Sequence, residues 1–120
     1  MDIEQFRNYC LSKKATTEEL PFGPDTLVFK VMGIMYALTG LDEEEFRVNL
    51  KCDPEYALEL RASYPDIIPG FHMNKKHWNT IYCERSIDEK TLISLIDHSY
   101  DLVVSKLTRK QKDELKNLES

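Results

Sequence analysis

The sequence predicts an α+β domain in which four or five strands form an antiparallel sheet and helices pack on one of its faces. Segments of alternating polar and apolar residues follow one another closely, and segments of helical periodicity stand before, between and after them. The resulting order is helix, three strands, helix, one or two strands and helix, which is typical of this class. A chain of 120 residues has the size of one domain, so we expect a single domain over residues 1–120.

The first elements are a helix and a hairpin. Asp2 is a suitable N-cap for a helix over residues 3–13, whose apolar side chains recur at helical spacing. Alternating residues predict a strand over 26–31, and Met32-Gly33 offers a tight turn because glycine tolerates a positive φ. The apolar run 34–38 then completes a hairpin.

A third strand and a second helix follow an acidic loop. In the segment 47–52, apolar Val48, Leu50 and Cys52 alternate with polar residues, which predicts a strand with one apolar side. Asp53-Pro54 combines an N-cap with proline at the first helical position, and Pro65 ends the helix that it opens.

The second half of the chain predicts one further strand and two helices. The segment 78–84 alternates, and a fifth strand is expected either beside Ser86 or within residues 68–73. The segment 86–89 matches a capping box for a helix of about 20 residues, and Thr108 to Gln111 matches a second box for a short terminal helix.

Composition limits the function classes. The net charge of −5 opposes non-specific attraction to nucleic acid or anionic membranes, although residues 42–45 carry four of the acidic charges. A polyanion must therefore be met by a local patch. We find neither a secretory signal nor a membrane span and expect a cytoplasmic protein without membrane contact. The cysteines, Cys10, Cys52 and Cys83, are far apart, which predicts reduced, buried thiols.

The segment 70–79 has the most unusual composition, because it combines lysine, histidine, asparagine and tryptophan without an acidic residue. Phosphate contact together with base stacking requires this combination, which makes Lys75, Lys76, His77 and Asn79 candidate nucleic-acid ligands. Trp78 is either a stacking ring or the buried anchor of the sheet. His72 and His77 lack neighbours with ligand-like spacing, so no metal site is expected.

The polar side of the sheet is a second candidate surface. If Lys30 shares it with Arg47, Asn49 and Lys51, three cations stand together beside the lysines at 75 and 76. The same pattern also fits a solvated sheet face without any ligand. Five cations that each met a phosphate would give a salt slope of up to about −4.

Three longer segments resemble one family. TLVFKVMGIMYAL after Pro21-Phe22-Gly23, VNLKCDPEYALELRASYPDIIPGFHMNKKHWNTIY and LIDHSYDLVVSKL are together similar to the MmcQ/YjbR family of small bacterial proteins. The resemblance implies a CyaY-like α+β fold with a DNA-binding surface described as a double wing, and it implies no catalytic residues. The family often has a lysine in the first hairpin, where this sequence has Gly33-Ile34-Met35-Tyr36.

The sequence therefore predicts a non-catalytic binding module without a cofactor, monomeric, that binds double-stranded DNA weakly and in a salt-dependent manner. The expected ligand residues are Lys30, Arg47, Lys51, Lys75, Lys76, His77 and Asn79. The alternative is a protein-interaction or chaperone-like module of the bacterial cytosol. An enzymatic site around His72 and Cys83 ranks last, since nothing positive supports it.

Overall fold

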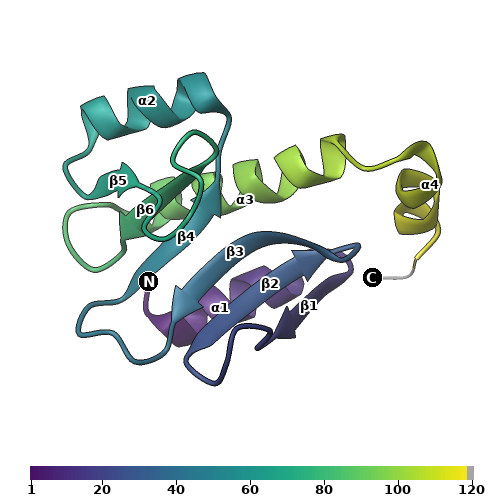
Figure 1. Cartoon of the computed structure of the whole chain (residues 1–120), viewed down its shortest axis with the longest axis horizontal. Coiled ribbons are helices and arrows are strands. Elements are labelled where there is room, and N and C mark those ends of the chain that lie inside the picture. Colours follow the sequence, from purple (N-terminus) through teal and green to yellow (C-terminus); the bar gives the residue numbers. More distant parts are fainter. Residues whose placement is uncertain (119–120) are drawn as a thin grey trace.

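The computed structural model describes residues 1–118, which form one six-stranded antiparallel sheet with four helices (Figure 1). The strands are β1 (Thr16–Glu19), β2 (Thr26–Val31), β3 (Ile34–Gly40), β4 (Arg47–Lys51), β5 (Ile67–Pro69) and β6 (Trp78–Tyr82). The helices are α1 (Ile3–Ser12), α2 (Pro54–Ser63), α3 (Glu89–Ser105) and α4 (Arg109–Asn117). The predicted α+β class is confirmed, with six strands in place of four or five.

The strands are ordered β1-β2-β3-β4-β6-β5 across the sheet. Helices α1 and α3 cover one face, which we call the covered face, while α2 lies beside β5 and α4 stands at the far end (Figure 1). The opposite face is the open face. Because successive strand residues point to opposite sides, the register assigns each side chain to one of these faces. The exception is the register shift between β2 and β3, where the consecutive Tyr36 and Ala37 both join the main core.

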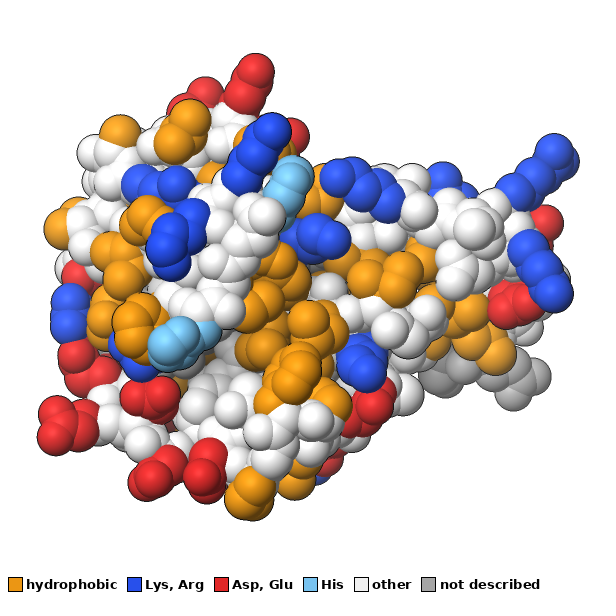
Figure 2. Space-filling view, viewed as in Figure 1, with side chains coloured by type: hydrophobic (Ala, Val, Ile, Leu, Met, Phe, Trp, Pro, Cys, Tyr) orange, Lys and Arg blue, Asp and Glu red, His pale blue; other side chains and the backbone are white. Residues whose placement is uncertain are grey.

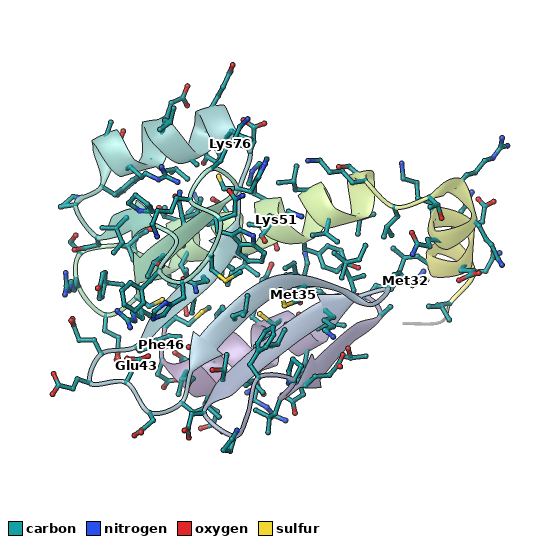
Figure 3. All side chains as sticks on the ribbon, in the orientation of Figure 1. Met32, Met35, Glu43, Phe46, Lys51 and Lys76 are labelled. Carbon is teal, nitrogen blue, oxygen red and sulfur yellow. The ribbon has the colours of Figure 1, made fainter. Side chains whose placement is uncertain are left out.

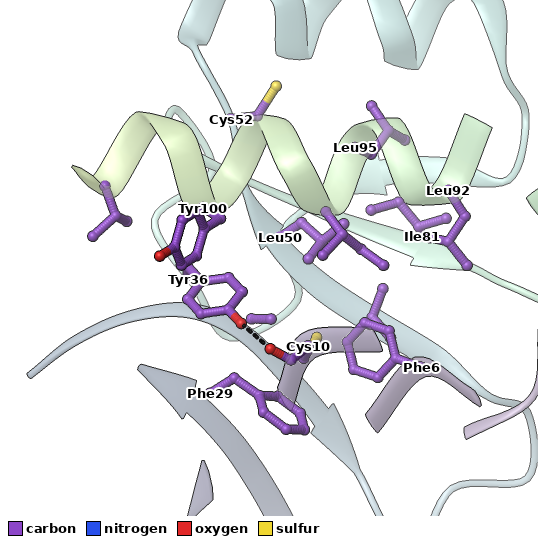
Figure 4. Packing of buried hydrophobic residues seen from close by; sticks show 14 of the residues in the cluster. Phe6, Cys10, Phe29, Tyr36, Leu50, Cys52, Ile81, Leu92, Leu95 and Tyr100 are labelled. Atoms are coloured by element: carbon purple, nitrogen blue, oxygen red, sulfur yellow. Dashed lines mark hydrogen bonds between the residues drawn. The ribbon is translucent and has the colours of Figure 1, made fainter. Parts of the chain in front are cut away.

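The main hydrophobic core lies between the covered face and the helices (Figure 4). Phe6 of α1 meets Phe29 of β2 edge to face, with ring centroids 5.7 Å apart. The Tyr36 hydroxyl donates a hydrogen bond of 3.1 Å to the Cys10 carbonyl, and the Tyr36 ring packs edge to face on Tyr100 of α3. Each large apolar side chain buried here contributes roughly 1.5–3 kcal/mol to stability.

The hairpin and most helix starts follow the predictions. Met32 and Gly33 both have a positive φ, of 51° and 80°, as a two-residue turn of the I′ type requires. Asp2, Asp53 and Thr108 cap α1, α2 and α4.

One predicted cap is wrong. Asp88 caps α3 by accepting a hydrogen bond of 2.7 Å from the Thr91 amide, and the helix has 17 residues. Ser86 instead donates its backbone N–H and its hydroxyl to the Asp66 carboxylate, which has no counterpart in the local sequence pattern. The strand expected beside Ser86 is therefore absent from the described chain, whereas β5 overlaps the other expected segment, 68–73.

Strand β1 was not predicted. Its sequence, Thr-Thr-Glu-Glu, contains no apolar residue, so it carries no alternation, and it exists because it pairs with β2 at the edge of the sheet. The terminal strands of the sheet are the short ones, β1 and β5.

The three cysteines are buried and unpaired, as predicted. Burial raises the pKa of Cys10 and Cys83 to about 12 and that of Cys52 to about 11. Within residues 1–118, none of the helices has the length and apolar character needed to cross a membrane.

Candidate binding surface on the open sheet face

The open face gathers the polar side of the strands, as predicted. Pairing places Asn49 opposite Thr80 and next to Leu38 across β3, while Lys51 lies opposite Trp78. Arg47, Asn49 and Lys51 are alternate residues of β4 and therefore share this face. Lys30 of β2 lies two residues from Val28, which packs on Leu38 and Trp78 of the same face.

Two of the predicted cations are already paired with carboxylates. The Lys30 ammonium lies 3.3 Å from the Glu19 carboxylate of β1, and the Arg47 guanidinium lies 3.2 Å from that of Glu43. Arg47 also donates a hydrogen bond of 3.4 Å to the Tyr82 hydroxyl. These two residues therefore share this face with the other cations but bring little free positive charge to it.

The remaining predicted cations are Lys51, Lys75 and Lys76, and Lys106, which was not predicted, lies near Lys51. We call these four lysines the cationic patch. In the part of the chain that the structure describes, none of the four forms an ion pair. Figure 2 shows Lys and Arg side chains across the upper half of this view, while Asp and Glu side chains stand at its top edge and gather at its lower left. Figure 3 places Lys51 and Lys76 at the upper end and Glu43 at the lower end.

Lys51 is the member of the patch whose positive charge is least favourable in the folded protein. Its side chain is half-buried, and desolvation followed by the nearby charge of Lys106 lowers its pKa. A partly desolvated ammonium beside a second lysine is electrostatically unfavourable until an anion joins it. The patch is thus prepared for a negatively charged ligand.

The loop 70–77 lies over the open face and supplies two of these lysines. Its ends are joined by a hydrogen bond of 2.8 Å from the Gly70 amide to the Trp78 carbonyl, and the Phe71 amide donates to the Thr80 hydroxyl at 2.9 Å. The Lys75 ammonium donates to the Gly70 carbonyl at 2.9 Å. Arg61 of α2, which lies outside the loop, donates a hydrogen bond to the Lys75 carbonyl. The loop is therefore held at both ends and across its middle.

Gly70 is required by this arrangement. A Cβ at position 70 would lie 2.8 Å from the Trp78 Cβ and 3.0 Å from the Trp78 carbonyl oxygen. Only glycine lets the start of the loop approach β6 so closely.

Two residues of the predicted set have different roles from those expected. Trp78 is only 7% exposed and packs with Val28 and Leu38, so it is the anchor of the sheet and not a stacking ring. Asn79 is 2% exposed because its side chain points to the covered face, where its Oδ1 accepts a hydrogen bond of 2.7 Å from the Arg61 Nε. The prediction of Asn79 as a surface ligand is wrong for this reason.

His77 is half-buried between Lys76 and Trp78, and its carbonyl accepts a hydrogen bond of 2.8 Å from the Cys52 amide. Its backbone thus joins the loop to the end of β4, next to Lys51.

A pocket of about 320 Å³ opens on the same face at the other end of the loop. It lies between loop 70–77, the loop before β2 and the ends of β3 and β4. Its apolar walls are Phe22, Leu38, Phe71 and Met73, and its polar groups include Glu43, Arg47, Asn49 and His72. Sequence reasoning did not find this pocket, since its walls come from four separate segments.

An aromatic ring and a guanidinium form one wall of the pocket. The Arg47 guanidinium carbon lies 4.6 Å from the centroid of the Phe71 ring, which is a cation–π contact. Phe71 is 45% exposed and Phe22 is 64% exposed. The segment 70–79 does offer an exposed ring beside lysines, but that ring is Phe71 and not Trp78.

The residues considered for metal binding or nucleophilic chemistry do not converge. Within residues 1–118, no three histidine, cysteine or acidic side chains are grouped to hold a metal ion. His72 lines the pocket on the open face, whereas Cys83 is buried in the main core with a pKa raised to about 12. A thiolate nucleophile activated by His72 is therefore not formed by this arrangement.

The sequence is similar to several bacterial proteins. It is 41% identical to YbdF of Escherichia coli O157:H7 over 92 residues, which is 77% of this chain and 75% of that protein. It is 30% identical to YjbR of Escherichia coli K12, covering 93% of this chain and 95% of the relative. YyaQ of Bacillus subtilis is 35% identical, with 82% of this chain and 79% of that protein covered.

Solved structures have the same fold. The crystal structure of a Deinococcus radiodurans protein with a DUF419 domain matches with a TM-score of 0.89 at 38% identity, covering 98% of this chain and 90% of that one. A crystal structure of a Pseudomonas syringae protein matches with a TM-score of 0.75 at 32% identity, covering 85% of this chain and 98% of that one. The sequence model of the YjbR family matches residues 11–102. The chain therefore belongs to the YjbR family.

Proposed function

We propose that this protein is a non-catalytic binding module of the cytoplasm and that its open face binds DNA through the backbone phosphates. The observation that carries the proposal is the cationic patch. Lys51 lies near Lys106 and beside the end of the loop that carries Lys75 and Lys76, and none of the four forms an ion pair within the described chain. Phosphate contacts of this kind position nucleic acid without reading its sequence.

The patch narrows the set of ligand residues expected from the sequence. Lys51, Lys75 and Lys76 remain, Lys106 joins them, and the ion-paired Lys30 and Arg47 become secondary. The turn of the first hairpin, at Met32 and Gly33, carries no cation, so the proposed surface does not use it as a wing. Four phosphate contacts predict a salt slope of up to about −3.5, and weak binding follows from so few contacts and from the acidic net charge.

The direct test is fluorescence anisotropy with a labelled DNA duplex at about 50 mM salt, repeated over a salt series. The variant Lys51→Glu/Lys76→Glu is expected to lose at least tenfold in affinity, because it reverses two patch charges. The matched control is Lys110→Glu/Lys112→Glu on α4, which makes the same change in net charge on an exposed helix outside the patch.

The control should retain affinity within a few-fold of the wild type, since only long-range repulsion changes. Equal losses in the two double variants would show a non-specific charge effect and contradict the proposal. Absence of binding to any form of DNA by the wild type at high protein concentration would also contradict it.

A further inference from the structure

We infer that the pocket on the open face takes one unpaired nucleobase of a single-stranded nucleic acid whose backbone runs to the cationic patch. This inference rests on the proposed function and deepens it, because it names the form of nucleic acid that the surface prefers. Three features of the pocket lead to it.

The first feature is the chemistry of the walls. The rings of Phe22 and Phe71 are exposed, whereas Trp78 is buried. Both exposed rings line the pocket, which has a volume of about 320 Å³. Pockets of this size and character accept flat organic groups, and aromatic rings bind bases by stacking. The Arg47 guanidinium and the His72 ring both pack on the Phe71 ring, at 4.6 Å and 4.2 Å from its centroid, so a base that stacks on this ring must displace one of them.

The second feature is the position of the pocket beside the patch. Arg47 and Asn49 line the pocket, and Lys51, the next residue of β4 on the same face, belongs to the patch. Two residues along a strand span only about 7 Å. Loop 70–77 likewise contributes Phe71, His72 and Met73 to the pocket and Lys75 and Lys76 to the patch. A base and its neighbouring phosphates therefore fit the two regions simultaneously.

The third feature is the distribution of charge. The pocket holds one carboxylate, Glu43, and this group is paired with Arg47. Of the other acids in the loop 41–46, Glu45 is paired with Arg85, and Asp42 and Glu44 form no ion pair in the described chain. The acidic loop repels phosphates from the far side of the pocket. A strand is thus directed from the pocket towards the lysines and not across the acidic loop.

The side-chain amide of Asn49 offers little means of distinguishing one base from another. The Asn49 side-chain amide already donates to the Phe71 carbonyl at 3.3 Å, and its oxygen accepts from the Thr80 hydroxyl. Stacking without free amide groups is tolerant of sequence. A base inside an intact duplex cannot reach the pocket, since it must first leave its stack.

The test compares a labelled single strand of about 12 nucleotides with its duplex in the same anisotropy assay. The wild type is expected to bind the single strand roughly tenfold more tightly, because only this form can place a base in the pocket. Phe71→Leu keeps an apolar side chain but removes the ring, and should lose most of that preference. Phe71→Tyr restores a ring and should restore the preference.

Leu58→Ala is the matched control, since Leu58 is an exposed apolar residue of α2 that lines neither the pocket nor the patch. Thermal unfolding of each variant confirms that the fold is retained. If Phe71→Leu and Phe22→Ala keep wild-type affinity for the single strand, the inference is overturned and the rings are left for a protein partner.

The assay separates this inference from the proposed function. Equal affinity for both forms, with loss in Lys51→Glu/Lys76→Glu, retains the phosphate surface but rejects the base pocket. No binding of either form rejects both.

Discussion

The two faces of the sheet differ in how their side chains are packed and paired. On the covered face, Phe29, Val48, Leu50 and Ile81 are buried against helices. The buried Asn79 side chain accepts a hydrogen bond from Arg61 at its Oδ1, while its Nδ2 has no partner within residues 1–118. On the open face, Lys51 of β4 has no ion pair in the described chain, and its charge is partly desolvated. The pocket is exposed beside it. The covered face is packed mainly with apolar side chains, whereas the open face carries lysines without an ion pair in the part of the chain that the structure describes and a pocket beside them. This difference identifies the open face as the place to look for a ligand.

The largest effect is expected from truncating one apolar side chain on each face. Leu50→Ala on the covered face should lower the free energy of unfolding by about 3 kcal/mol, because it leaves a cavity in a fully packed core. Met35→Ala on the open face should cost only about 1 kcal/mol, since Met35 is half-buried beside the small cluster of Val28, Leu38 and Trp78. Denaturant unfolding measures both, and equal costs would contradict the contrast between the faces.

Gly70→Ala tests whether the open face depends on a fixed loop. The added Cβ would meet β6 and Met73 at 3.0 Å or less, so the loop must move. We expect a loss of about 2 kcal/mol in the free energy of unfolding, together with weaker nucleic-acid binding.

Gly33→Ala is the control for Gly70→Ala, because its Cβ would meet nothing within 4 Å although its φ is also unfavourable for alanine. It should destabilise the hairpin by about 1 kcal/mol without changing binding. If Gly33→Ala lost binding while Gly70→Ala kept it, the binding site would have to be assigned to the hairpin.

Lys51→Met is expected to separate stability from binding. Desolvation lowers the pKa of Lys51, so the folded state binds its proton less tightly than the unfolded state does and the charge opposes folding at neutral pH. The variant should be at least as stable as the wild type, yet bind DNA several-fold more weakly with a salt slope reduced by about 1. A clear loss of stability would show that Lys51 is a structural residue.

The smallest effect on stability is expected at Asp66, whose negative charge is stabilised by hydrogen bonds in the folded protein. Asp66 accepts two hydrogen bonds from Ser86, and these hold the pKa of its carboxyl below the ordinary value of 3.8. A lowered carboxyl pKa stabilises the fold above 3.8, and this contribution is lost as the pH falls through the folded-state value. Asp66→Asn should therefore be less stable than the wild type at neutral pH, with a difference that shrinks below pH 3.8.

Urea unfolding across that pH range measures the difference. A gap between Asp66→Asn and the wild type that stays constant down to strongly acidic pH would show that the ionised form of Asp66 is not favoured by folding. The charges of Lys51 and Asp66 are thus expected to have opposite effects on stability. The Lys51 charge has no partner in the described chain and opposes folding, whereas the Asp66 charge accepts hydrogen bonds and favours it.

Local sequence patterns were sufficient for most of the fold. Helices α1, α2 and α4 begin where their caps stand, and the hairpin turns at Met32 and Gly33. Alternation in β4 assigned Arg47, Asn49 and Lys51 to one face correctly. Strand β1 could not be found in this way, because an edge strand of threonine and glutamate owes its conformation to β2.

The candidate site was predictable only in part. The parity of residues 78–82 already places Asn79 on the same face as buried Ile81, so that error was avoidable. The ion pair of Lys30 was not predictable, since its partner Glu19 belongs to the unpredicted strand β1. The partner of Arg47 is Glu43, four residues earlier, and this pair depends on the conformation of the loop before β4. The choice between Trp78 and Phe71 as the exposed ring likewise depends on the packing of Val28 and Leu38.

The burial of all three thiols has a practical consequence. Because Cys10, Cys52 and Cys83 are shielded and hold their protons far above neutral pH, alkylating reagents should leave the native molecule untouched. The rate at which these sulfurs become modified then reports how often the interior opens. A fluorophore attached to a single cysteine introduced on the surface would be site-specific without removing any natural residue.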